Sequence, residues 1–329
     1  MMADPTAPII TPTRVAAALL VAGVVITFGF SANNYLLQAG TTLAMSAVLC
    51  LAWNIVGGFM GYPSFGTAAF FGVGAYAGGI LQDAGVPLAL AWIGAAAAGA
   101  MFAAFLGSVL LGLRGHYFAI GTIAVVEVMR EVANNWEGLT GGAIGINIPI
   151  LAGSPREVGI FFYLAMWALV AATFALTAAI AHSKFGFSLR CIRQNESAAH
   201  MVGIAVFRAK CAAFIISGLL ISLAGAVYAS MVAFIEPKDV FNILLSIEVP
   251  AMVMLGGAGT ILGPLIGATI YILLRELVWV NFINFHSAIL GIIIIAVIYL
   301  MPEGLVRRFH AQAWSKLTKR SPSQSGAGS

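Results

Sequence analysis

Charged side chains are scarce in this chain. Only 9% of its 329 residues are Asp, Glu, Lys or Arg, and 61% are hydrophobic, whereas soluble proteins carry about 25% charged residues. A soluble domain of this size must cover its surface with polar groups, and this composition does not supply enough of them. The shortage of charge therefore excludes a water-soluble enzyme and predicts an all-α polytopic membrane protein.

Motifs for catalysis and metal binding are missing as well. The sequence has no GxxxxGK(S/T) loop to cradle phosphates, no HExxH and no GxSxG, so we predict that the chain is not an enzyme and binds no ATP itself. Its three cysteines, Cys50, Cys191 and Cys211, form no CxxC pair and have no His at metal spacing, which predicts neither a disulfide nor a metal site. The net charge of +4 comes without a basic stripe interleaved with aromatics, which favours a membrane surface over nucleic acid as a partner.

Long apolar runs fill most of the sequence. A membrane-crossing helix needs about 20 mostly apolar residues, and some of the runs found here are short or interrupted by glycine. We predict a short N-terminal segment over 1–14, a membrane domain over 15–306, and a basic, partly disordered tail over 307–329. The ten predicted spans are 15–32, 36–57, 64–81, 87–112, 116–132, 158–181, 211–234, 240–256, 258–275 and 286–301.

The basic residues are distributed unevenly among the predicted connections. In the ten-span scheme, twelve of the sixteen Lys and Arg fall on one face. Most of them lie in the connection 182–210 and in the tail after residue 301. Cytoplasmic connections carry an excess of Lys and Arg. The pattern therefore predicts a multi-pass protein with both termini, and the connection 182–210, in the cytoplasm.

Three acidic residues, Glu127, Glu131 and Glu248, fall within predicted spans, where a charge in hydrocarbon is costly and marks a functional candidate. Glu127 has Arg130 three residues later, so it either neutralises itself in a helical ion pair or lines a polar path. Glu248 has no obvious cation nearby in the sequence, and it either bonds backbone amides or lines a cavity. Such a sparse set disfavours a proton- or sodium-driven carrier, which needs a titratable relay.

Two glycine-rich breaks stand in corresponding parts of the two halves, at 57–66 and at 256–264. Paired interruptions of this kind are found at discontinuous-helix sites of transporters, and they are also found as simple turns between spans. A polar, glycine-rich stretch at 134–145 either docks a soluble partner or gates a vestibule. Its candidate residues are Asn134, Asn135, Trp136, Thr140 and Gly141.

The segment 188–203 predicts a short cytoplasmic helix between two spans, bounded by Gly186 and Gly203. A helix that lies along the membrane, with basic side chains displayed and small alanines for close contact, suits docking to a soluble motor. The alternative is a basic connector that only sets topology. The candidate residues are Arg190, Arg193, Gln194, Asn195, Glu196, Ser197, Ala198, Ala199 and Gly203.

Several motifs in order resemble one family. The sequence RCIRQNESAAHMVGI at 190–204, followed by AFIISG at 213–218 and LAGAVYA at 223–229, resembles the LivH/LivM-type permeases of ABC importers. Other stretches agree, including SFGTAAFFGVGAY at 64–76, LRGHYFAI at 113–120, MVMLGG at 252–257 and MPEGL at 301–305. The similarity runs from about residue 50 to 306 and is greatest to the M-type permease of branched-chain amino-acid systems.

This resemblance implies a heteromeric importer in the bacterial inner membrane. The implied partners are a homologous H-type permease, two ATPase subunits of the LivG/LivF type that use ATP and Mg²⁺, and a periplasmic binding protein. It also implies that the 190–203 helix is the coupling helix gripped by the ATPases. By analogy, the residues that flank the translocation path are Ser64, Phe65, Gly66, Glu127, Glu248, Gly256 and Gly257.

The expected solute is a branched-chain amino acid. Permeases of this group also carry urea and short amides, so these remain alternatives. An ATP-independent channel or secondary carrier is the alternative from another class, and it predicts solute movement without partner chains.

Overall fold

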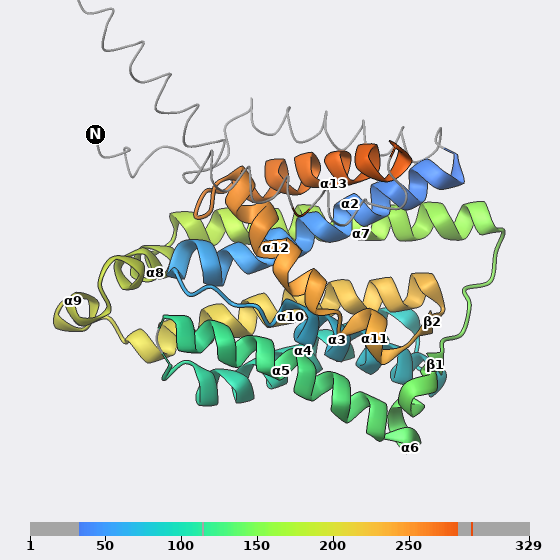
Figure 1. The fold of residues 1–329 in the computed structure, drawn as a ribbon, viewed down its shortest axis with the longest axis horizontal. Coiled ribbons are helices and arrows are strands. Elements are labelled where there is room, and N and C mark those ends of the chain that lie inside the picture. Colours follow the sequence, from blue (N-terminus) through green and yellow to red (C-terminus); the bar gives the residue numbers. More distant parts are fainter. Residues whose placement is uncertain (1–32, 114, 282–290, 292–329) are drawn as a thin grey trace, which may run out of the picture.

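The computed structural model describes residues 33–113, 115–281 and 291. These residues form a bundle of helices with one small β-ribbon (Figure 1). In chain order the elements are α2 (Asn34–Trp53), the π-helix η1 (Asn54–Met60), α3 (Thr67–Asp83), α4 (Leu88–Leu110), α5 (His116–Asn135), α6 (Glu137–Thr140), η2 (Gly142–Ile144), β1 (Ile146–Asn147), α7 (Pro155–His182), α8 (Lys184–Gln194), α9 (Glu196–Met201), α10 (Val206–Val232), β2 (Phe234–Ile235), α11 (Pro237–Val240), α12 (Ile243–Gly256) and α13 (Gly263–Asn281).

Local sequence explains where the helices begin and end. Helix α7 starts with a capping box, in which the Ser154 hydroxyl accepts a hydrogen bond from Glu157 N while the Glu157 carboxylate accepts one from Ser154 N. Pro155 occupies the first turn, where no N–H is needed. The π-helix η1 ends at Gly61 in the left-handed conformation, which glycine adopts without steric penalty.

Helix α10 is the centre of the bundle and packs against both α3 and α4. Small residues allow the approach: a Cβ on Gly74 of α3 would lie 2.0 Å from the Ser222 carbonyl oxygen of α10. A Cβ on Gly225 of α10 would in turn lie 2.1 Å from the Phe71 carbonyl oxygen. Close backbone contact through glycine is the usual way in which helices associate in lipid. A second layer, formed by α2, α7 and α13, lies along the other side (Figure 1).

The ten predicted spans are matched only in part. Eight of them lie within the described residues, and each overlaps a helix. Five helical stretches in this part of the chain are long and apolar enough to cross a membrane, namely 34–60, 88–110, 155–182, 206–232 and 237–256. The predicted spans 15–32 and 286–301, and the segments 1–14 and 307–329, lie outside the described residues.

The chain leaves helical structure between η1 and α3. Residues 61–66 form an extended stretch that runs back from the end of η1 toward the middle of the bundle, where α3 begins (Figure 1). The prediction of a span that starts at residue 64 is therefore wrong by three residues, because α3 begins at Thr67. We call residues 61–66 the re-entrant segment.

The two ends of the bundle differ in structure. At one end, β1 and β2 pair antiparallel, with Ile146 opposite Ile235 and Asn147 opposite Phe234, close to α6 (Figure 1). At the other end, α8 and α9 form a hairpin that extends beyond the long helices (Figure 1). We call these the β1–β2 end and the α8–α9 end.

Candidate functional site

The α8–α9 hairpin contains two helices rather than the single predicted one. Helix α8 ends at Gln194, Asn195 has extended backbone angles, and α9 starts at Glu196. The Asn195 side chain accepts a hydrogen bond 3.1 Å from Ala198 N, which satisfies one of the free N–H groups of α9. The predicted 190–203 helix is therefore wrong in form, because asparagine at this position caps a new helix and interrupts the old one.

One face of the hairpin rests on the bundle and the other is free. Leu189 and Ile192 of α8 and Ala199 of α9 are buried. At the tip, Met201 and Val202 are 83% and 74% exposed. Of the other candidate residues predicted from the sequence, Glu196 is half-buried, and those exposed are Arg190, Arg193, Gln194, Asn195, Ser197, Ala198 and Gly203.

The two arginines of α8 bond to the protein's own backbone. Arg190 Nη1 donates to the Ala181 carbonyl oxygen at 2.8 Å, on the preceding helix. Arg193 Nη1 donates to the Gly58 carbonyl oxygen in η1 at 2.5 Å. A Cβ on Gly61 would lie 2.6 Å from Arg193 Cγ, so the absence of a side chain at position 61 leaves room for the arginine stem.

The two glycine-rich breaks meet at this same end. Asn54, fully buried, donates to the Thr260 carbonyl oxygen at 2.9 Å and accepts from Gly259 N at 2.8 Å. A Cβ on Gly259 would lie 2.5 Å from Arg193 Nη1. Arg193 therefore lies against both breaks, the one at 57–66, which contains the re-entrant segment, and the one between α12 and α13.

The second break is a tight turn between neighbouring helices. A Cβ on Gly256 would lie 1.8 Å from the Gly263 carbonyl oxygen, so the glycine lets α12 and α13 cross closely. Gly257 follows with a φ of +119°. Of the two alternatives for this break, a simple turn is the one found. The first break differs, because it contains the re-entrant segment.

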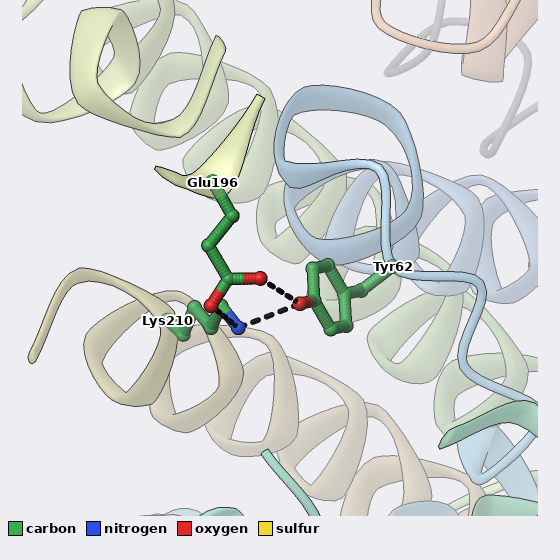
Figure 2. A network of polar contacts seen from close by, with 3 residues as sticks. All are labelled: Tyr62, Glu196 and Lys210. Atoms are coloured by element: carbon green, nitrogen blue, oxygen red, sulfur yellow. Dashed lines mark hydrogen bonds and ion pairs between the residues drawn. The ribbon is translucent and has the colours of Figure 1, made fainter. Parts of the chain in front are cut away.

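A buried ion pair ties α9 to α10 and to the re-entrant segment (Figure 2). Lys210 of α10 is 2% exposed, and its Nζ lies 2.6 Å from Glu196 Oε1 and donates to the Tyr62 hydroxyl at 2.6 Å. The Tyr62 hydroxyl donates in turn to Glu196 Oε2 at 2.7 Å. The Tyr62 ring meets Phe118 of α5 edge to face, with centroids 5.4 Å apart. Each of the three polar groups thus bonds both of the others.

Further along, the re-entrant segment is held by three surrounding helices. Trp53 of α2 donates from Nε1 to the Ser64 carbonyl oxygen at 2.6 Å. Phe65 N donates to the Thr122 hydroxyl of α5 at 2.9 Å. Just inside α3, Ala68 N donates to the Ser246 hydroxyl of α12 at 2.9 Å. Ser64 and Gly66 are buried and Phe65 is half-buried, so these candidate path residues lie where α2, α5 and α12 converge.

The two candidate acids in the spans have partners on the chain. Glu127 and Arg130 form the expected helical ion pair at 2.5 Å, with side chains 36% and 37% exposed. Glu248 of α12 hydrogen-bonds the Tyr271 side chain of α13 and lies near Arg275. The expectation that Glu248 has no cation nearby is wrong, because α13 folds back against α12. Glu248 thus faces α13 and does not share a site with Glu127.

At the β1–β2 end, the predicted gate residues form a compact turn. The Thr140 hydroxyl donates to the Ala133 and Trp136 carbonyl oxygens at 2.6 and 2.8 Å. Gly141 has a φ of +68°. The Asn135 side chain donates to the Glu131 carbonyl oxygen at 2.8 Å, and Asn134 precedes it in α5. Trp136 is exposed. The polar residues therefore shape the turn, and Trp136 presents a surface.

Sequence reasoning missed Tyr62 and Lys210. Lys210 was counted among the basic residues of the connection 182–210, but α10 begins at Val206 and buries it. A lysine adjoining a long apolar run, with a single acid in the preceding connection, was the available signal. Nothing local marks Tyr62, whose partners lie more than a hundred residues away.

Metal and disulfide chemistry find no support in the described part of the chain. Within residues 33–113, 115–281 and 291, no group of three or more His, Cys, Asp and Glu side chains is placed to hold a metal ion. Cys50, Cys191 and Cys211 are free thiols.

The arrangement defines a class of protein. It is a bundle of long apolar helices that pack closely through glycine, and side-chain hydrogen bonds and an ion pair join its protruding hairpin to the interior. Such helices belong in a membrane. A family model described as the permease component of a branched-chain amino acid transport system matches residues 15–298. The chain therefore belongs to this family of membrane-integral transport permeases.

Individual relatives agree with the family. The chain is 28% identical to the high-affinity branched-chain amino acid transport permease LivM of Salmonella typhimurium, over 88% of this chain and 73% of the relative. The LivM protein of Escherichia coli K12 gives the same identity and coverage. The autoinducer 2 import permease LsrC of Enterobacter sp. strain 638 is 27% identical over 74% of this chain and 73% of its own. No solved structure gives a significant match.

Proposed function

We propose that this chain is a permease subunit of an ATP-binding-cassette importer in the bacterial inner membrane. It forms the translocation path together with a homologous permease. Two separate ATPase subunits hydrolyse ATP with Mg²⁺, and a periplasmic binding protein delivers the solute. The chain itself catalyses no reaction and binds no cofactor. Membership of the permease family and the similarity to LivM support this proposal.

The observation that carries the proposal is the apolar tip of the α8–α9 hairpin. Met201, the last residue of α9, and Val202, which follows it, are largely exposed, and α9 protrudes from the end of the bundle (Figure 1). Lipid covers apolar faces along the spans, but it does not cover a projecting polar hairpin, and exposed apolar groups there mark a protein contact. The proposed ATPase docking site is therefore this tip of the hairpin, within the segment 190–203.

The path runs beside α5. The half-exposed pair of Glu127 and Arg130 is too costly to face hydrocarbon, so this face of α5 is turned toward the second permease and the path between the two. Phe65 bonds to the same helix and Gly66 lies next to it, and Ser64, bonded to Gly66 N, completes the wall. Glu248, Gly256 and Gly257 are left out of the proposed path, because they serve the contact between α12 and α13.

The side of the membrane on which the hairpin lies determines where the other end of the bundle and the termini are placed. With the α8–α9 end in the cytoplasm, the β1–β2 end faces the periplasm, and Trp136, beside Asn134, Asn135, Thr140 and Gly141, docks the binding protein. Ten spans then place both termini in the cytoplasm. The proposed solute is a branched-chain amino acid, as named for the LivM relatives.

The test is co-expression with candidate ATPase subunits, permease partner and binding protein, followed by purification and reconstitution in liposomes. We expect leucine uptake only with ATP and the full assembly. Replacing Met201→Asp places a charge in the docking contact, and ATPase co-purification should fall at least about tenfold. The matched control, Ile150→Asp, changes an equally exposed apolar residue outside the hairpin and should retain the ATPases.

Other outcomes separate the alternatives. Uptake of leucine by this chain alone, without ATP, would identify a channel or secondary carrier. ATP-dependent uptake of urea or acetamide but not leucine would support the assignment as an importer and would contradict a branched-chain amino acid as the solute. Full retention of the ATPases by the Met201→Asp variant would place the docking surface elsewhere.

A further inference from the structure

The α8–α9 hairpin is connected to the re-entrant segment by polar side chains rather than by backbone pairing. Arg193 reaches the Gly58 carbonyl oxygen, three residues before the segment starts. Glu196 reaches Tyr62, the second residue of the segment. Lys210 closes the triangle from α10 (Figure 2). The hairpin is therefore bonded to both sides of Gly61, the residue at which the chain reverses direction.

The triangle is sensitive to displacement because its charges are shielded from water. Lys210 is 2% exposed and the Glu196 side chain is 19% exposed. A buried charge that loses a partner carries a large penalty, so the three groups stay together or rearrange together. Movement of α9 by the length of one hydrogen bond would carry Tyr62 with it or leave Lys210 with a broken pair.

Tyr62 is also where the triangle meets the interior. Its ring packs edge to face on Phe118 of α5, and Phe118 in turn packs on Phe214 of α10, with centroids 6.0 Å apart. Three residues further on, Phe65 N is bonded to Thr122, one turn beyond Phe118 on α5. Displacement of Tyr62 therefore acts on the re-entrant segment and on α5 at once.

We propose that Tyr62 is a positioning residue that transmits displacement of the α8–α9 hairpin, through Glu196 and Lys210, to the re-entrant segment and the start of α3. The proposal rests on the proposed function, since it assigns the hairpin to an ATPase. It adds the route by which the hairpin acts on residues 61–66.

The test uses the reconstituted assembly and a readout that does not depend on the solute. In a variant without the three native cysteines, Phe65→Cys reports the re-entrant segment by its rate of maleimide labelling, with and without vanadate-trapped ATP. We expect trapping to change the rate in this reference protein. Tyr62→Phe keeps the ring on Phe118 but removes the hydroxyl, and it should shrink the response by about two- to thirtyfold, the range for mutations that modulate coupling.

A double-mutant cycle distinguishes transmission from general damage. Glu196→Gln should reduce the response alone, and adding Tyr62→Phe to it should reduce the response little further, because both act through one network. Tyr228→Phe, which removes the hydroxyl of another half-buried tyrosine, packed on Phe71, is the matched control and should leave the response intact. Melting temperatures of all variants in detergent show whether the bundle is preserved.

The experiment distinguishes failure of the proposed function from failure of the proposed role of Tyr62. If the reference protein binds no ATPase, or shows no ATP-dependent change in labelling at position 65, the proposed function or its coupling fails, and the inference fails with it. If the reference responds and Tyr62→Phe responds equally, or if the effects of Tyr62→Phe and Glu196→Gln simply add, the importer stands and the role of Tyr62 is overturned.

Discussion

The two ends of the bundle are held together by different kinds of bonds. At the β1–β2 end the chain is closed by main-chain hydrogen bonds, with Ile146 paired to Ile235 and Ile148 N donating to the Ala233 carbonyl oxygen at 2.8 Å. At the α8–α9 end, segments distant in sequence are joined by the side chains of Asn54, Arg193 and Lys210.

This difference separates a fixed end from an adjustable one. A β-ladder moves only as a unit, because both partners are backbone. A side chain can exchange one partner for another by rotating about its own bonds. We therefore expect the end that carries the protruding hairpin, rather than the β1–β2 end, to adopt a second arrangement without local unfolding. Substitutions at the two ends should accordingly destabilise the protein by different amounts and for different physical reasons.

The largest expected effect is at the β1–β2 end, with Gly145→Ala. Gly145 has a φ of +82°, and a Cβ there would lie 2.2 Å from the Ile235 carbonyl oxygen. Backbone strain and overpacking together should destabilise the fold by about 4 kcal/mol. Thermal unfolding of the purified chain in detergent measures it. Gly138→Ala, with open space around the position, is the control; equal melting of the two variants would contradict a rigid closure at β1–β2.

The next effect is at the α8–α9 end, with Asn54→Leu. This change leaves Gly259 N and the Thr260 carbonyl oxygen without their side-chain partner, which should cost about 3 kcal/mol. Asn135→Leu removes an exposed amide whose one bond is to its own helix, and we expect a small change in melting temperature. Similar losses for both variants would show that the bridge between the two glycine-rich breaks is not specific.

A smaller effect is expected for Lys210→Met. Glu196 loses its buried cation but can turn its partly exposed carboxylate toward water, so the loss should be about 2 kcal/mol, below that of a fully buried pair. The matched control is Lys238→Met at the other end, where a 74% exposed lysine lies 2.8 Å from Glu236. Exposed pairs contribute little, and melting should not change. If Lys210→Met melted like the control, the triangle would not stabilise the α8–α9 end.

Helix boundaries show how far sequence patterns reach. The pattern places a span at 211–234, whereas α10 occupies 206–232. The larger difference is at the start of the helix, because the sequence pattern assigns Lys210 to a loop. A hydropathy window cannot recognise that Glu196 of α9 neutralises Lys210 of α10. The interruption at Asn195 was within reach of sequence reasoning, since asparagine followed by glutamate is typical of a helix start.

The candidate site divides in the same way. The predicted pairing of Glu127 with Arg130 is confirmed, whereas the role of the 190–203 segment stays a prediction. The sequence pattern misjudged Glu248, whose partners Tyr271 and Arg275 lie on the next helix. Its failure to find Tyr62 has the same cause, because the importance of this residue depends entirely on which distant groups surround it.

The sequence by itself determined that the chain is built for a membrane, where most of its helices lie and which permease family it belongs to. These properties depend on composition and on motifs that extend over a few tens of residues. Only the tertiary structure decided that Arg193 meets both glycine-rich breaks and that Glu196, Lys210 and Tyr62 form one buried triangle. Such contacts arise from the packing of several helices, and no single segment carries the information that specifies them.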